Sequence, residues 1–199
     1  MQLNDALVQI AQIRRQLARS EVFRGYRAAT TAFSGVMAVV AAAIQSFWLP
    51  NTVWAALILW LCAAVVSLSV VGIEMFLSCR RNASPLQNEL TFAAIEQFVP
   101  CLVVGALVTF VLVRFAPDQL WLMPGLWGVF FGLGVFASRQ LLPRGIGAVG
   151  AWYLLSGLCS IAIGSQTADF SAWHMGVIFG CGQFASAGVL YWNLERNRG

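Results

Sequence analysis

Six long apolar segments, separated by short polar stretches, make up most of this chain of 199 residues. Each segment reaches about 20 residues, the length that an α-helix needs to cross the hydrocarbon core of a bilayer. The pattern predicts membrane spans at residues 29–49, 53–77, 90–114, 121–142, 147–165 and 173–194. The connections are too short to hold another domain, so we expect residues 28–199 to form one all-α, six-helix membrane bundle.

The first 27 residues are polar and amphipathic instead. Apolar residues recur at three- and four-residue intervals, and arginines lie elsewhere on the helical wheel. This pattern predicts a short cytoplasmic helix over residues 1–27, which lies on anionic headgroups or against a partner helix. No short apolar stretch with a cleavage site follows it, so the pattern does not predict a signal peptide.

The arginines predict how the bundle is oriented. All twelve basic residues are arginine, and eleven fall on one side when both termini and the 2–3 and 4–5 connections are placed together. That count includes Arg139, and only Arg114 lies on the other side. Because cytoplasmic loops are enriched in basic residues, both termini are expected in the cytoplasm. The compact loops favour a multi-pass protein of a bacterial inner membrane.

Composition agrees with a membrane protein. The chain is 59% hydrophobic and 10% charged, with a mean hydropathy of +0.76, whereas soluble domains carry roughly 25% charged residues. The sequence pI of about 9.1 does not indicate nucleic-acid binding, because the arginines are scattered through short connections and form no basic stripe. The lipid bilayer is therefore the expected partner.

The third span carries the polar residues that first suggest a function. Glu96 and Gln97 lie within it, and a carboxylate there needs a partner, a proton or a water-filled path. Pro100 deprives the carbonyl of residue 96 of its helical donor, so a helix break is expected there. Glu74 and Arg139 have a similar depth, which suggests an inner-leaflet cluster of Glu74, Glu96 and Arg139. Such a cluster would be an ion, proton or solute site, or else a structural ion pair or snorkelling side chains.

The second, fourth and sixth spans each show a patterned face. Trp60, Ser67 and Glu74 share one face of the second span at seven-residue spacing. Small residues line one face of the fourth and of the sixth span, which allows helix backbones to approach closely, either within the bundle or in a homo-oligomer. These residues are Gly125, Gly128 and Gly132, and Gly176, Gly180 and Ala187, with Gln183 among the latter.

A faint internal repeat relates the two halves of the chain. With an offset of 93 residues, Gly35 meets Gly128; after a loop difference, Gln97 meets Gln183. Three spans in each half would make the halves inverted, as in many transporters. Gln183, near the middle of its span, is thereby paired with the polar residues of the third span.

No catalytic, metal or cofactor site is predicted. His174 is the only histidine, and the five cysteines include no C-x-x-C pair, so neither a zinc set nor a bis-histidine haem site can be assembled. Residues 132–137 match a dinucleotide motif by letter but lie inside a span with no preceding strand. The sequence therefore does not predict an enzyme.

Two functions are consistent with these features. The first is a small-solute or ion transporter, or a channel-like subunit, that uses an intramembrane carboxylate. Its candidate residues are Glu96, Gln97, Gln183, Glu74 and Arg139, with Pro100 at the helix break. The second is a non-transporting membrane sensor, scaffold or assembly subunit, whose protein partner the sequence does not identify.

Overall fold

The computed structural model describes residues 28–50, 52–81, 85–143, 145–167 and 169–195. Every regular element in these ranges is a helix. They are α2 (Ala28–Phe47), α3 (Val53–Arg81), α4 (Pro85–Phe115), η1 (Pro117–Leu122), α5 (Met123–Ala137), η2 (Ser138–Gln140), α6 (Ile146–Thr167), α7 (Ala172–Leu190) and η3 (Tyr191–Glu195). The predicted N-terminal helix, residues 1–27, lies outside the described residues.

Six of the helical segments are long and apolar enough to span a membrane, which confirms the predicted multi-spanning, all-helical architecture. Their bounds differ most around the second connection, because α3 continues to Arg81 and α4 already begins at Pro85. Hydropathy marks where the bilayer ends, whereas polar residues with good helix propensity continue the helix beyond it. Proline at the first helical position starts α4 without losing a hydrogen bond.

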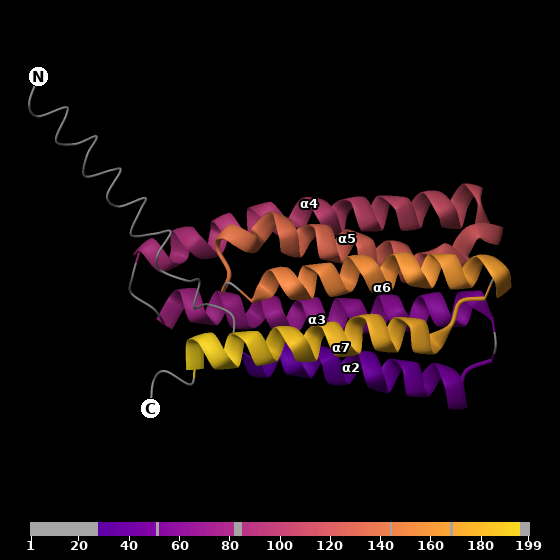
Figure 1. Cartoon of the computed structure of the whole chain (residues 1–199), viewed down its shortest axis with the longest axis horizontal. Coiled ribbons are helices and arrows are strands. Elements are labelled where there is room, and N and C mark those ends of the chain that lie inside the picture. The colour runs from indigo at the N-terminus through magenta and orange to yellow at the C-terminus, as the bar shows by residue number, and fades with distance from the viewer. Residues whose placement is uncertain (1–27, 51, 82–84, 144, 168, 196–199) are drawn as a thin grey trace, which may run out of the picture.

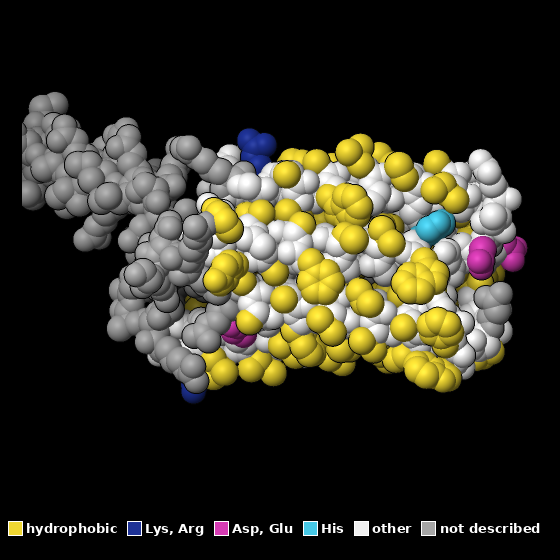
Figure 2. Space-filling view, turned by 60° about the horizontal axis from the view of Figure 1, so that its bottom comes forward, with side chains coloured by type: hydrophobic (Ala, Val, Ile, Leu, Met, Phe, Trp, Pro, Cys, Tyr) yellow, Lys and Arg dark blue, Asp and Glu magenta, His cyan; other side chains and the backbone are white. Residues whose placement is uncertain are grey.

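The bundle has two ends, which we call proximal, where α2 begins and α7 ends, and distal, the opposite end (Figure 1). Figure 2 shows hydrophobic side chains along the middle of one face, with charged side chains only near the two ends. This distribution matches a slab of hydrocarbon bounded by polar headgroups.

The helices pack in chain order, and the last returns to the first. The most extensive contacts join α5 with α6 and α2 with α7, while α3 and α4 touch each other least among neighbouring pairs (Figure 1). The described helices therefore form a ring. We call the interfaces between neighbouring helices seams: the α5–α6 and α2–α7 seams are tight, and the α3–α4 seam is loose.

Glycines create the two tight seams. A methyl group at Gly157 of α6 would lie 2.7 Å from the carbonyl oxygen of Gly125 and 2.9 Å from the amide nitrogen of Val129, both in α5. Between α2 and α7, a methyl group at Gly35 would lie 3.2 Å from Cβ of Gln183. The small-residue faces of α5 and α7 therefore pack against helices of the same chain.

A tryptophan indole forms a hydrogen bond between the two helices of each of three pairs, α2–α3, α4–α5 and α6–α7. In every pair an indole N–H donates a hydrogen bond across the interface, where the surrounding apolar groups offer no competing water. The bonds run from Trp60 Nε1 to Gln45 Oε1 (2.6 Å, α3 to α2), from Trp127 Nε1 to Thr109 Oγ1 (2.9 Å, α5 to α4) and from Trp152 Nε1 to the Ile178 carbonyl (3.1 Å, α6 to α7).

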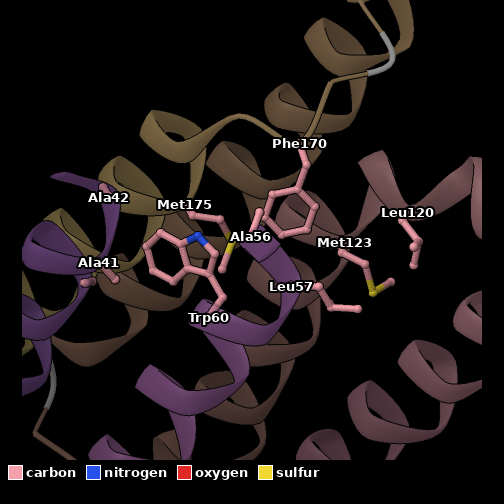
Figure 3. Close-up of a cluster of buried hydrophobic side chains, with 10 residues drawn as sticks. Ala41, Ala42, Ala56, Leu57, Trp60, Leu120, Met123, Phe170 and Met175 are labelled. Carbon is pink, nitrogen blue, oxygen red and sulfur yellow. The ribbon is translucent and has the colours of Figure 1, made fainter. Parts of the chain in front are cut away.

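An apolar core fills the distal half of the ring. Figure 3 shows the Trp60 indole beside Ala41 of α2 and Met175 of α7, with Phe170 and Met123 beyond it. The core takes residues from α2, α3, η1, α5, α7 and the loop before α7. A second core joins α5, α6 and α7 around the fully buried Tyr153. The distal half is thus closed by side chains from α2, α3, α4, α5 and α7.

The glycine seam predicts a large difference between two glycine substitutions. Gly157→Ala places a methyl group against backbone atoms of α5, whereas nothing lies within 4 Å of a methyl group at Gly72 of α3. Overpacking costs roughly 1–3 kcal/mol, so Gly157→Ala should lower the free energy of unfolding by about that amount. Gly72→Ala should leave it unchanged or slightly raised. Unfolding of the reconstituted protein by denaturant measures both; equal losses would contradict the seam.

Candidate ligand site in the proximal half of the bundle

Glu96 points away from the bundle. α4 packs on α5 and η2 through Ala94 and Phe98: Ser138 Oγ donates to the Ala94 carbonyl at 3.4 Å, and the Phe98 and Phe131 rings are 5.0 Å apart. Glu96 lies two residues beyond Ala94, and two residues turn an α-helix by about 200°. Its side chain is exposed, as is that of Gln97. The carboxylate singled out from the sequence therefore faces outward.

The predicted helix break at Pro100 needs correction. α4 is one helix from Pro85 to Phe115, with Pro100 inside it. The proline removes the donor to the carbonyl of Glu96, but the remaining hydrogen bonds of this long helix carry it past that position.

Arg139 lies level with Glu96 but does not contact it. It follows Ser138, whose hydroxyl bonds to Ala94, and its side chain is exposed. The Arg139 Cδ atom packs over Gly147 at the start of α6, 3.4 Å from where a β-carbon would stand. Among the described residues no ion pair or hydrogen bond joins Arg139 with Glu96 or Glu74, so the three-residue cluster stays a prediction.

Glu74, by contrast, lies on the face of α3 that points into the bundle. Ala56 and Trp60 are the buried residues of this face, and Glu74 is 18 residues after Ala56 (74 minus 56), which is about five full turns. Residues 63, 67, 70, 74 and 78 continue the same face and are all half-buried. One carboxylate oxygen of Glu74 has no accessible surface. The inward carboxylate is therefore Glu74.

Ser67 on this face lies level with Gln183 of α7. Trp60 packs beside Ala41 and Ala42 of the antiparallel α2. Seven residues further along α3 (67 minus 60), Ser67 is level with about residue 35 of α2 (42 minus 7). Gly35 in turn packs against Gln183. Glu74 lies about 10 Å closer to the proximal end, since seven residues rise by about that distance.

Gln183 is a buried residue whose amide forms no hydrogen bond with another described residue, although its polar atoms are not among those that are completely covered. Only 8% of its surface is accessible, and Ser186, one turn further on, is 7% accessible and likewise forms no hydrogen bond there. A buried polar group without a partner costs about 1–3 kcal/mol. Such groups in folded proteins normally bond to ordered water or to a ligand. These two side chains are therefore candidates for contact with water or a polar ligand.

Together these residues form what we call the proximal polar layer: Ser34, Ser67, Glu74, Gln183 and Ser186. It comes from α2, α3 and α7, on the proximal side of the apolar distal core. In the proximal half the polar side chains and the carboxylate thus lie on α2, α3 and α7, beside the second apolar core that joins α5, α6 and α7. The distal half is filled by the first apolar core.

The predicted pairing of Gln97 with Gln183 is not seen. Gln97 is exposed on α4, whereas Gln183 is buried against α2. Gly35 and Gly128, also related by the faint repeat, lie in different settings. Gly35 packs on α7, the last helix, but Gly128 packs on α6, the helix that follows its own. The repeat therefore does not place equivalent residues in equivalent contacts.

Within the described ranges, no group of three or more histidine, cysteine, aspartate or glutamate side chains could hold a metal ion. Comparisons with known protein families, with curated proteins and with solved structures find no match to this chain. The site is consequently defined by its own geometry.

The sequence alone indicated Glu74 and Gln183 as candidate site residues, but it favoured Glu96 as the central one. The seven-residue spacing of Trp60, Ser67 and Glu74 was the available signal, since a tryptophan on the same face marks the side that packs. Ser34 and Ser186 were missed, because isolated serines in apolar spans are common and bond readily to their own helix.

The buried Gln183 and the half-buried Gln45 predict opposite effects of the same substitution. Gln183→Met removes an amide without a described partner, so the free energy of unfolding should rise by about 1 kcal/mol. Gln45 accepts from Trp60 at 2.6 Å and donates to the Phe170 carbonyl at 2.9 Å. Gln45→Met leaves both groups unsatisfied and should cost about 1–3 kcal/mol. Denaturant unfolding in the same lipid measures both; destabilisation by Gln183→Met would show that its amide is satisfied.

Proposed function

We propose that the protein binds a cation or a small polar solute inside the membrane and acts as a transporter or channel-like subunit. Glu74 supplies the charge, and Gln183 supplies hydrogen bonds at the level of Ser67. The observation that carries this proposal is the buried residue Gln183, whose amide bonds to no other described residue and which lies level with Ser67 on the half-buried face that also bears Glu74. Ionisable residues that face a bundle interior commonly mark ion and substrate pathways.

The asymmetry of the bundle supports movement rather than binding alone. In the proximal half, α2, α3 and α7 carry polar side chains beside the core around Tyr153, while the distal half is closed by the core around Trp60, Met123 and Phe170. A polar layer next to an apolar barrier inside the membrane is an arrangement that alternating access can use. In this proposal the distal core is the closed gate.

A non-transporting membrane subunit is the second candidate. It is favoured by the outward face of α4, where Glu96 and Gln97 are exposed beside apolar residues such as Val99 and Val103. Polar groups on a face turned to lipid are costly unless they reach the headgroups or a partner helix. On this interpretation Glu96 is the residue that a partner would satisfy.

Exchanging each carboxylate for its isosteric amide distinguishes the two. In proteoliposomes under an imposed membrane potential, we expect proton or Na⁺ flux to fall at least tenfold in Glu74→Gln. The matched variant Glu96→Gln should retain the wild-type flux, because its side chain faces away from the bundle. Flux is followed with a pH-sensitive dye or with radioactive Na⁺.

The opposite result has a clear meaning. Loss of flux in Glu96→Gln with normal flux in Glu74→Gln would move the pathway outside the single bundle and overturn the proposal. Measuring the unfolding of both variants ensures that a lost flux reflects the carboxylate and not the fold.

A further inference from the structure

The loose seam of the ring lies between α3 and α4, next to the proximal polar layer. From Leu61 to Arg80 no residue of α3 is buried on any side. α3 and α4 touch each other least among neighbouring helices, although only residues 82–84 connect them. In the proximal half, α3 is therefore not closed against its neighbour in sequence.

The two helices are held by different partners. α3 is fixed to α2 at Trp60, whose indole bonds to Gln45, and this contact lies in the distal half. The proximal half of α4 is fixed to α5 and η2 through Phe98 and Ala94. Further along, Val108 and Leu112 of α4 pack against the distal core. The seam is thus closed distally and loose proximally, where its outer side faces lipid.

The surroundings of this seam are mainly apolar, and the exposed polar side chains of α4 near it include Glu96 and Gln97. Ile73 and Phe76, on either side of Glu74, are exposed, as are Val99 and Val103 of α4. A hydrated ion entering from the side would cross this apolar surface at high cost. A molecule with an apolar tail would gain from it, since burial of each CH₂ contributes about 0.8 kcal/mol.

We infer that the ligand is an amphipathic cation that comes from the bilayer. Its charged head lies on the inward face of α3 between the levels of Ser67 and Glu74, and its apolar tail leaves the bundle between the proximal halves of α3 and α4. Gln183 and Ser186 then satisfy polar groups of the head or the water bound to it. This inference rests on the proposed function and names the substrate class of the same site.

Two quaternary ammonium probes test the need for a tail. Octyltrimethylammonium and tetramethylammonium share a head, and their binding to the full chain in nanodiscs is measured by equilibrium dialysis, with empty nanodiscs subtracted. We expect the octyl compound to bind at least tenfold more tightly. Glu74→Gln should weaken its binding at least tenfold, and Glu96→Gln should leave the affinity unchanged.

A pair of serines on α3 tests the position of the head. Ser67 lies on the inward face and Ser69, two residues on and about 200° round the helix, is exposed on the outward face. Ser67→Phe should fill the part of the proximal polar layer that lies level with Gln183 and reduce octyltrimethylammonium binding at least tenfold. Ser69→Phe adds the same bulk toward lipid and should bind as the wild type does.

The outcomes separate this inference from the proposed function. Equal affinity for both probes, lost in Glu74→Gln, would overturn the amphipathic ligand and leave the site intact. Binding that neither Glu74→Gln nor Ser67→Phe weakens would overturn both. If Ser67→Phe and Ser69→Phe weaken binding equally, the head does not lie on the inward face, and the inference falls.

Discussion

Close backbone approach at glycines is the constraint on which the rest of this bundle depends. In a bilayer the hydrophobic effect does not drive helices together, because lipid tails are as apolar as the side chains. Dispersion between closely packed surfaces must supply the attraction, and it falls off steeply with distance. Gly157 against Gly125, and Gly35 against Gln183, allow that proximity. The seams α5–α6 and α2–α7 are consequently the tightest of the ring.

What lies outside these seams is less constrained. α3 and α4 have no comparable glycine contact with each other: Gly72 meets nothing within 4 Å, and Gly105 of α4 contacts Phe130 of α5. Their positions depend on side-chain contacts with α2 and α5, among them the hydrogen bonds of Trp60 and Trp127. Polar side chains on α3 can therefore remain half-buried, a condition that a tightly packed seam would not allow.

The architecture could be predicted from hydropathy, but the residues of the site could be predicted only in part. Span number follows from length and apolarity, which depend on the bilayer and not on neighbouring helices. Which side of a span faces inward depends on those neighbours. Nearly all sides of α4 are apolar, so periodicity could not show that Glu96 faces outward. On α3, Trp60 shares a face with Glu74, so the seven-residue spacing was enough to predict that Glu74 faces the interior of the bundle.

The two carboxylates also differ in what each requires energetically. An outward glutamate about one turn inside the membrane boundary can reach headgroup water by snorkelling, so its position needs no function to explain it. Glu74 faces the bundle, and one of its oxygens is fully covered, while nearby Gln183 keeps a buried amide that an apolar side chain of similar size could replace. Selection tolerates such costs where a polar interior is used. Glu74 and Gln183 both lie in the proximal half, and this shared position distinguishes a candidate site from scattered polar residues.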